Sequence, residues 1–294
     1  MPVSPVVSVV LGSYNRKPLL KLLMESLRRE LQGLDAEIIV VDGGSNDGSL
    51  AWLTRQKDVL TIVQHNRGQW LGKAIRRRSW GYFMNLAFRC AQGRYVCMLS
   101  DDCLVVPGAI RNGISRFGQL LQGGRKVGGL AFYWRNWPGM DDYAVYEFWG
   151  RMNINHGLYL RSALEEVGYA DEDTYTFYSG DVDLSFKLHH AGHPVLDAPD
   201  SFIEHYCHAS WDLRTGNQDL ALEDERRLVD KWRPIMTDTD FSVPDHVTMV
   251  SKVHEDPADT LAPFRRIHNS WRTRLGRLGS RVRGRLQRMA GGRS

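Results

Sequence analysis

Two runs of apolar, mostly β-branched residues near the N-terminus, each followed at once by a polar turn, constrain the fold more than any other feature. Residues 6–11 (VVSVVL) run into 12–16 (GSYNR), and residues 37–41 (EIIVV) run into 42–48 (DGGSNDG). Continuous Val/Ile runs bounded by turn residues predict strands buried on both faces, as in a parallel α/β sheet. Ligands of such sheets bind beyond the carboxyl ends of the strands, so we expect both turns to face a binding site.

The rest of the chain continues this alternation of strands and helices, which favours βαβ units and a doubly wound sheet. We expect a polar, basic loop over 69–78 and a loop-rich segment over 234–257. The remaining expected strands cover 60–63, 95–99, 127–134 and 201–203, and the expected helices cover 17–31, 49–56, 79–91, 108–122, 161–167, 183–191 and 220–232.

Composition excludes several classes of protein. The 294 residues are 24% charged and 43% hydrophobic, as in a soluble globular domain. No apolar run approaches the roughly 18–20 residues of a membrane-spanning helix, and no secretory signal is evident. The four cysteines form no C-x-x-C pair, so we expect neither a zinc site nor a disulfide framework, and a cytoplasmic location.

The charge is unevenly distributed along the chain. Residues 261–294 hold ten arginines and no acidic residue, so the net charge of +4 conceals a body of −6. In this tail, apolar residues recur every three or four positions from Ile267 to Met289, which predicts an amphipathic helix on an anionic membrane surface. An oligomerisation helix and nucleic-acid binding are the alternatives, although the apolar stripe argues against nucleic acid.

The two N-terminal turns resemble those of family-2, GT-A-type glycosyltransferases, although Gly43 replaces an aspartate of that family's pattern. The resemblance implies a doubly wound mixed sheet flanked by helices, with a C-terminal helical extension. We expect a glycosyltransferase domain over 1–215, a helical extension over 216–257 and a basic amphipathic tail over 258–294. The family also implies a nucleotide-diphosphate sugar donor, here a UDP- or dTDP-sugar.

Six residues are expected to bind the donor nucleotide. An aromatic face stacks on a base and a carboxylate accepts hydrogen bonds from an imide or a ribose hydroxyl, which assigns these roles to Tyr14 and Asp42. Asp42 as a simple turn cap is the alternative. The other four expected nucleotide-binding residues are Ser13, Arg16, Asn85 and Asp101.

A strand followed by Ser100-Asp101-Asp102 resembles the metal site of the family, with Ser100 at a position where the family often has an acid. Counting back from Pro107 assigns the metal to Asp102, and Asp101 remains the alternative. The family often has a histidine ligand where His205 stands, with His208 as the alternative. Carboxylate and imidazole ligands suit Mn²⁺ and tolerate Mg²⁺.

Residues 169–192 contain the strongest resemblance, to the family's Glu-Asp-x-Asp-Leu block, in which Gly180 replaces the glutamate. The resemblance makes Asp181 the general base on the acceptor hydroxyl and gives Asp183 a supporting role. Both aspartates as caps of a helix N-terminus are the alternative. Among nearby aromatic and polar residues, Trp137 and His156 are the candidates for binding the acceptor.

Together these features predict an inverting, metal-dependent glycosyltransferase. We expect its acceptor to be a cell-envelope or lipid-linked glycan and the enzyme to be peripheral at the inner face of the cell membrane, because of the tail. A catalytically inactive GT-A module that acts as a membrane-surface scaffold and a nucleotidyltransferase are the alternative functions.

Overall fold

The computed structural model describes residues 5–206, 218–241 and 247–270. The chain separates into two compact units, Met1–Glu255 and Asp256–Ser294. The second unit contains helix α9 (Ala262–Asn269), and most of the basic tail lies outside the described residues. So does the boundary predicted after residue 215, which stays a prediction. No helix within the described ranges is long and apolar enough to cross a membrane.

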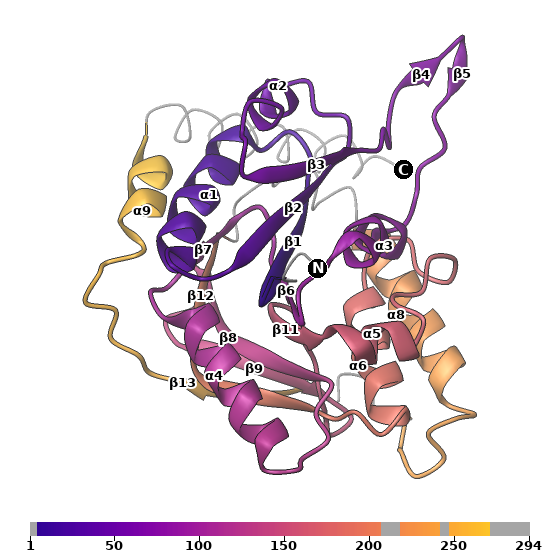
Figure 1. Ribbon diagram of the computed structural model, residues 1–294. Coiled ribbons are helices and arrows are strands. Elements are labelled where there is room, and N and C mark those ends of the chain that lie inside the picture. The colour runs from indigo at the N-terminus through magenta and orange to yellow at the C-terminus, as the bar shows by residue number, and fades with distance from the viewer. Residues whose placement is uncertain (1–4, 207–217, 242–246, 271–294) are drawn as a thin grey trace, which may run out of the picture. The chain divides into compact units, whose positions relative to one another are not determined.

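The centre of the first unit is a parallel sheet. Strand β1 (Val7–Ser13) lies between β2 (Ala36–Asp42) and β6 (Tyr95–Met98), and β3 (Val59–Val63) continues the sheet beyond β2 (Figure 1). All three pairings are parallel, so the turns after β1, β2 and β6 lie at one edge of the sheet. Successive side chains of β1 enter opposite cores, as the uninterrupted apolar run predicts.

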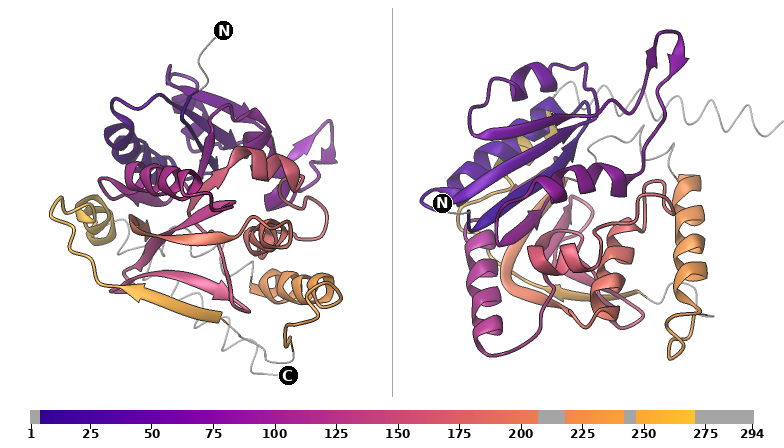
Figure 2. Two further views of the ribbon diagram at one scale, coloured as in Figure 1. Left: turned by 60° about the horizontal axis from the view of Figure 1, so that its bottom comes forward. Right: turned by 45° about the vertical axis from the view of Figure 1, so that its right-hand side comes forward.

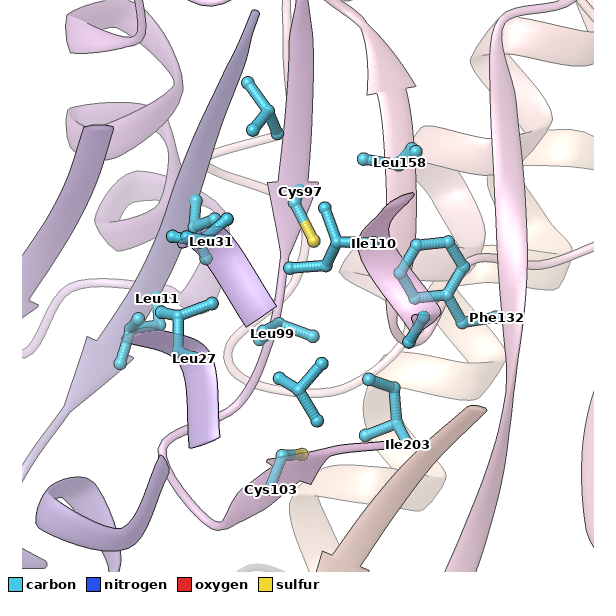
Figure 3. Close-up of a cluster of buried hydrophobic side chains, with 14 of the residues drawn as sticks. Leu11, Leu27, Leu31, Cys97, Leu99, Cys103, Ile110, Phe132, Leu158 and Ile203 are labelled. Carbon is cyan, nitrogen blue, oxygen red and sulfur yellow. The ribbon is translucent and has the colours of Figure 1, made fainter. Parts of the chain in front are cut away.

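Helices cover both faces of this sheet. Helices α1 (Lys17–Leu31) and α4 (Ala109–Gln122) contribute to one core, which also contains Leu11, Cys97 and Phe132 (Figure 3). The opposite core contains residues of α3 (Trp80–Cys90), α5 (Arg161–Glu166) and α6 (Gly180–His190). Helix α1 has the predicted bounds, whereas α2 (Ser49–Leu53) is three residues shorter than expected.

The second half of the sheet is mixed. Strand β11 (Gly157–Leu160) is antiparallel to both β6 and β8 (Gly129–Trp137), while β12 (Val195–Tyr206) runs parallel to β8 and antiparallel to β7 (Cys103–Val105). The mixed sheet with helices on both faces confirms the expected fold class. Strands β9 (Tyr143–Phe148), β10 (Arg151–Met152) and β13 (Val247–Lys252) extend it (Figure 2).

Two segments that were expected to be loops contain strands. The segment expected to be loop-rich contains β13, which pairs with β9 over six residues. The expected basic loop contains a small hairpin of β4 (Gln69–Trp70) and β5 (Lys73–Ala74), which forms a separate two-stranded sheet. This hairpin projects from the main sheet in both Figure 1 and Figure 2. Helix α8 (Gln218–Trp232) agrees with its prediction to within two residues.

Candidate active site

A cavity of about 700 Å³ opens at the edge of the sheet where the parallel strands end. Its wall is formed by the turns after β1 and β6, the start of α6 and the end of β12. Seven of the residues singled out from the sequence line it: Ser13, Tyr14, Arg16, Asp101, Asp102, Asp181 and His205. Residues 102 and 181, almost eighty positions apart, therefore share one cavity.

Arg16 joins the two acidic residues that follow β6. Its Nη1 lies 2.7 Å from Asp101 Oδ1 and 2.8 Å from Asp102 Oδ2. Ser13 donates a further hydrogen bond to Asp101 Oδ2 at 2.9 Å. Burial alone would lower the pKa of Arg16, but the two carboxylates raise it, while burial raises the pKa of Asp101 despite the guanidinium. Arg16 thus neutralises much of the negative charge that the fold buries here.

Asp102 and His205 have the donor atoms that a divalent cation requires. His205 Nε2 lies 3.3 Å from Asp102 Oδ1, and its other ring nitrogen lies 2.9 Å from Asn136 Oδ1. If Asn136 accepts through that oxygen, Nδ1 carries the proton and Nε2 directs a lone pair towards the carboxylate, an arrangement that a cation between them would stabilise. No group of three or more His, Cys, Asp or Glu among the described residues is arranged to hold a metal. This pair fits a cation that takes its other ligands from a diphosphate and water.

Asp181 lies in the first turn of α6, where the helix dipole favours an anion. Its Oδ2 accepts hydrogen bonds from Asn155 Nδ2 at 3.2 Å and from Asn153 Nδ2 at 3.5 Å. Burial raises the pKa of Asp181, although both amides favour the charged form. A carboxylate with a raised pKa that faces a cavity is suited to accept a proton.

Asp183 is fully buried beneath Asp181 and does not line the cavity. Its Oδ1 accepts hydrogen bonds from Tyr175 Oη at 3.0 Å and Trp232 Nε1 at 2.7 Å, and Lys231 Nζ lies 2.8 Å away. Lys231 also contacts Asp171 Oδ2 at 2.7 Å. Asp183 therefore links the start of α6 to the end of α8 through its contacts with Lys231 and Trp232.

A second residue of α8, Asp224, holds the loop before α6. Its buried carboxylate accepts backbone hydrogen bonds from Thr176, Phe177 and Tyr178 at 2.8–2.9 Å. Phe177 and Tyr178 line the cavity. Sequence reasoning missed Asp224 and Lys231, because each lies more than forty residues from its partners and no local motif marks either one.

Two of the departures from the family pattern are glycines that an aromatic ring covers. A Cβ atom at position 43 would lie 3.1 Å from the ring of Tyr14, and one at position 180 would lie 2.8 Å from the ring of Trp80. Tyr14 and Trp80 both line the cavity. The rings of Tyr14 and Trp80 therefore lie where the acidic side chains of the family pattern would begin.

Four further candidates lie outside the cavity lining. Asp42 is buried and caps the following turn, where its Oδ1 accepts from the backbone N–H groups of Gly44 and Ser45. Asn85 is buried and hydrogen-bonded to both backbone groups of Ala170, so its amide joins α3 to the loop before α6.

The two acceptor candidates lie behind the metal candidates. His156 Nε2 is 2.8 Å from Cys103 Sγ, and burial lowers the pKa of His156 to about 3, which keeps the ring neutral. Trp137 stacks on Tyr206 with ring centroids 5.9 Å apart. His156 is buried and stacks on Trp134, which lines the cavity, so it supports that wall and does not itself contact an acceptor.

Basic residues at the base of the hairpin form another part of the wall. Arg67, Arg77 and Arg78 line the cavity, and the guanidinium of Arg67 lies 5.4 Å from the ring centre of Tyr14. Burial and the like charge of Arg67 lower the pKa of Arg77. Clustered cations at a cavity wall are suited to binding a polyanion such as a diphosphate.

Comparison with solved structures gives the following similarities. The fold resembles that of the mannosyltransferase PcManGT from Pyrobaculum calidifontis in complex with GDP-Man and Mn²⁺, with 18% sequence identity, a TM-score of 0.54 and coverage of 80% of this chain and 69% of that one. S. aureus TarS 1-349 has 13% sequence identity and a TM-score of 0.49, with coverage of 81% of this chain and 75% of that one. Its complex with UDP-GlcNAc has 14% identity and a TM-score of 0.48, with coverage of 78% and 73%. No curated protein matches the chain in sequence at a significant level. Residues 8–138 match the model of the family described as Glycosyl transferase family 2, and the chain therefore carries a domain of that family with the GT-A fold.

Proposed function

We propose that the protein transfers a sugar, with inversion, from a nucleotide-diphosphate sugar to a hydroxyl acceptor. The observation that carries the proposal is the single cavity that combines buried carboxylates and arginines with a separate carboxylate, Asp181, at a helix N-terminus. The first group is suited to a diphosphate and the second to proton abstraction. An inactive scaffold would not need a desolvated base held by two amide donors.

In the proposed reaction, Asp181 accepts the proton of the acceptor hydroxyl while the acceptor oxygen attacks the anomeric carbon. The new glycosidic bond forms as the bond from that carbon to the diphosphate oxygen breaks, and the electron pair leaves with the nucleoside diphosphate. Asp181 afterwards returns its proton to water. Asn153 and Asn155 orient the carboxylate towards the acceptor and stabilise its charged form.

The donor would lie against the turns after β1 and β2. We assign the base and ribose to the face of Tyr14 and the neighbouring backbone, with Asp42 shaping the turn beside them. Arg67, Arg77 and Arg78 would neutralise the diphosphate, together with Arg16. Asp102 and His205 would hold Mn²⁺ or Mg²⁺, which when bound stabilises the charge of the leaving diphosphate.

The acceptor is proposed to be a glycan or a lipid-linked saccharide of the cell envelope. The support is the aromatic wall around Trp137 and Trp134, which suits sugar rings and prenyl chains, and the basic composition of residues 261–294. The enzyme would then work as a peripheral protein at the inner face of the cell membrane.

A panel of UDP-, dTDP- and GDP-sugars with Mn²⁺ tests the donor. We expect one of them to raise the melting temperature and to release its nucleoside diphosphate in the presence of an acceptor. Asp181→Asn should retain donor binding and lose transfer, and Asp102→Asn should lose metal-dependent donor binding. Asp173→Asn, which changes an exposed aspartate in the loop before α6, should leave both intact. Full transfer by Asp181→Asn would refute the assignment of the base.

A further inference from the structure

The tip of the β4–β5 hairpin exposes two adjacent apolar side chains. Trp70 is 74% exposed and Leu71 is 85% exposed. Each strand of the hairpin has only two residues, and the hairpin pairs with no other described strand, so it projects away from the main sheet (Figures 1 and 2). These side chains therefore add no burial that would stabilise the fold.

The geometry of the turn does not account for the leucine. Leu71 and Gly72 form the two-residue loop between the strands, and both have positive φ, +49° and +73°. A loop with two left-handed residues favours Asn-Gly or Asp-Gly, and leucine is disfavoured there. The apolar side chain at this position therefore runs against the local preference of the backbone.

The flanks of the tip are strongly basic. Arg67, Lys73, Arg76 and Arg77 are exposed, and none of them has an ion pair with another described residue. The sequence contains no aspartate or glutamate between Asp58 and Asp101. Lys73 and Arg76 do not line the cavity, so their charge is available to an external anionic surface.

Hydrogen bonds at the base of the hairpin connect it to residues that line the cavity. The amide of Asn66 exchanges two hydrogen bonds with the backbone of Arg78, and the backbone N–H of Ile75 donates to Gly68 O at 2.9 Å. Because Asn66 and Arg78 both line the cavity, the tip and the cavity mouth are parts of one connected structure.

From these four observations we infer that the hairpin tip is a membrane-docking element that inserts Trp70 and Leu71 into the interfacial layer of an anionic lipid bilayer. Tryptophan is enriched at membrane–water interfaces, and lysine and arginine beside it are attracted by anionic headgroups. Docking in this way would bring the cavity mouth next to the lipid surface. The inference depends neither on sugar transfer nor on the basic tail, since it stands on the residues of the hairpin.

Vesicle flotation of the full chain tests the proposal, with phosphatidylcholine vesicles that contain or lack phosphatidylglycerol. Trp70→Ser/Leu71→Ser should weaken binding to the anionic vesicles by about tenfold or more, because two apolar side chains no longer enter the interface. Leu222→Ser, which changes another exposed leucine (72%), is the matched control and should bind like the wild type.

A spectroscopic measurement separates the hairpin from any other membrane-binding segment. The protein has nine tryptophans, so the difference in emission between the wild type and Trp70→Phe isolates Trp70. We expect this difference spectrum to shift to the blue on addition of anionic vesicles and to be quenched by brominated lipid. An unchanged spectrum would overturn the proposal, as would a shift caused only by UDP, dTDP or GDP with Mn²⁺, which would make the tip a lid over the donor. Donor hydrolysis is measured in parallel, so that failure of docking and failure of the proposed function are seen separately.

Discussion

The contact between α8 and the loop before α6 gives the most quantitative prediction. Asp224 is fully buried, with Oδ1 bonded to the backbone N–H of Thr176 and Oδ2 to those of Phe177 and Tyr178. In Asp224→Asn, the better orientation of the new amide keeps its oxygen at the Oδ2 position. Two hydrogen bonds then survive without their charge, while the NH₂ group opposes the N–H of Thr176 and replaces the oxygen that lies 3.5 Å from Arg227 Nη1.

The expected loss of stability follows from this count. A hydrogen bond to a charged group contributes about 1.5–3 kcal/mol, and the two remaining bonds are also weakened, so we expect Asp224→Asn to lower the free energy of unfolding by about 2–3 kcal/mol. In a domain of this size, that corresponds to a fall in melting temperature of roughly 4–10 °C. Because Phe177 and Tyr178 line the cavity, transfer activity should fall by about tenfold or more.

Calorimetry and initial rates of nucleoside diphosphate release measure the two effects. Asp230→Asn changes an exposed aspartate on the same helix and is the matched control. If Asp224→Asn melted with the control and kept full activity, α8 would not position the loop, and the interpretation of this contact would be wrong.

Three further predictions concern the neighbouring contacts. Gly180→Ala places a Cβ atom 2.8 Å from the ring of Trp80, so we expect a loss of about 1–3 kcal/mol in urea unfolding and lower activity; unchanged stability would show that the indole moves freely. Asn155→Ala removes an amide that favours the charged form of Asp181, so the pKa of Asp181 should rise further and the acid limb of the pH profile of kcat should move to higher pH. If the acid limb did not move, it would report the titration of a group other than Asp181. Lys231→Met leaves Asp171 and Asp183 without their shared cation and should destabilise the protein by about 3–5 kcal/mol at neutral pH. Although burial raises the pKa of Asp171, its hydrogen bonds from Lys231 and Thr174 hold that pKa well below its usual value. The stability from this contact is therefore present above the unfolded pKa, near 4, and is lost as the pH falls through the folded pKa. The urea midpoints of wild type and variant should converge in acid, and a difference independent of pH would contradict the assignment.

The sequence allowed the parallel half of the fold to be predicted, because its signals are local. Continuous apolar runs marked β1 and β2, and the 3.6-residue period with a proline in the first turn gave α1 its bounds. Strand β13 was missed because it is exposed on one edge and has few core residues. The start of α6 was placed three residues late, since Ser179 caps it in a left-handed conformation that no sequence pattern signalled.

Some residues of the candidate site are likewise marked by local sequence signals, and others are not. Residues that follow a strand directly, such as Ser13 and Asp102, could be found because the sheet itself brings them to one edge. Asn85 matched a family position, yet its amide is used to hold the backbone of Ala170, a partner that only the tertiary structure supplies. Asn153 and Asn155 offered only a weak signal, a pair of amides just before a buried strand.

The pairing of Arg16 with Asp101 and Asp102 has a consequence for how the enzyme would meet its substrate. Since one internal guanidinium already offsets part of the charge of these two carboxylates, we expect the domain to stay folded without a divalent ion. A cation could then arrive together with each donor and depart with each product, without a resident metal to be retained between turnovers. Chelators would halt such a catalyst reversibly while leaving its melting curve almost untouched.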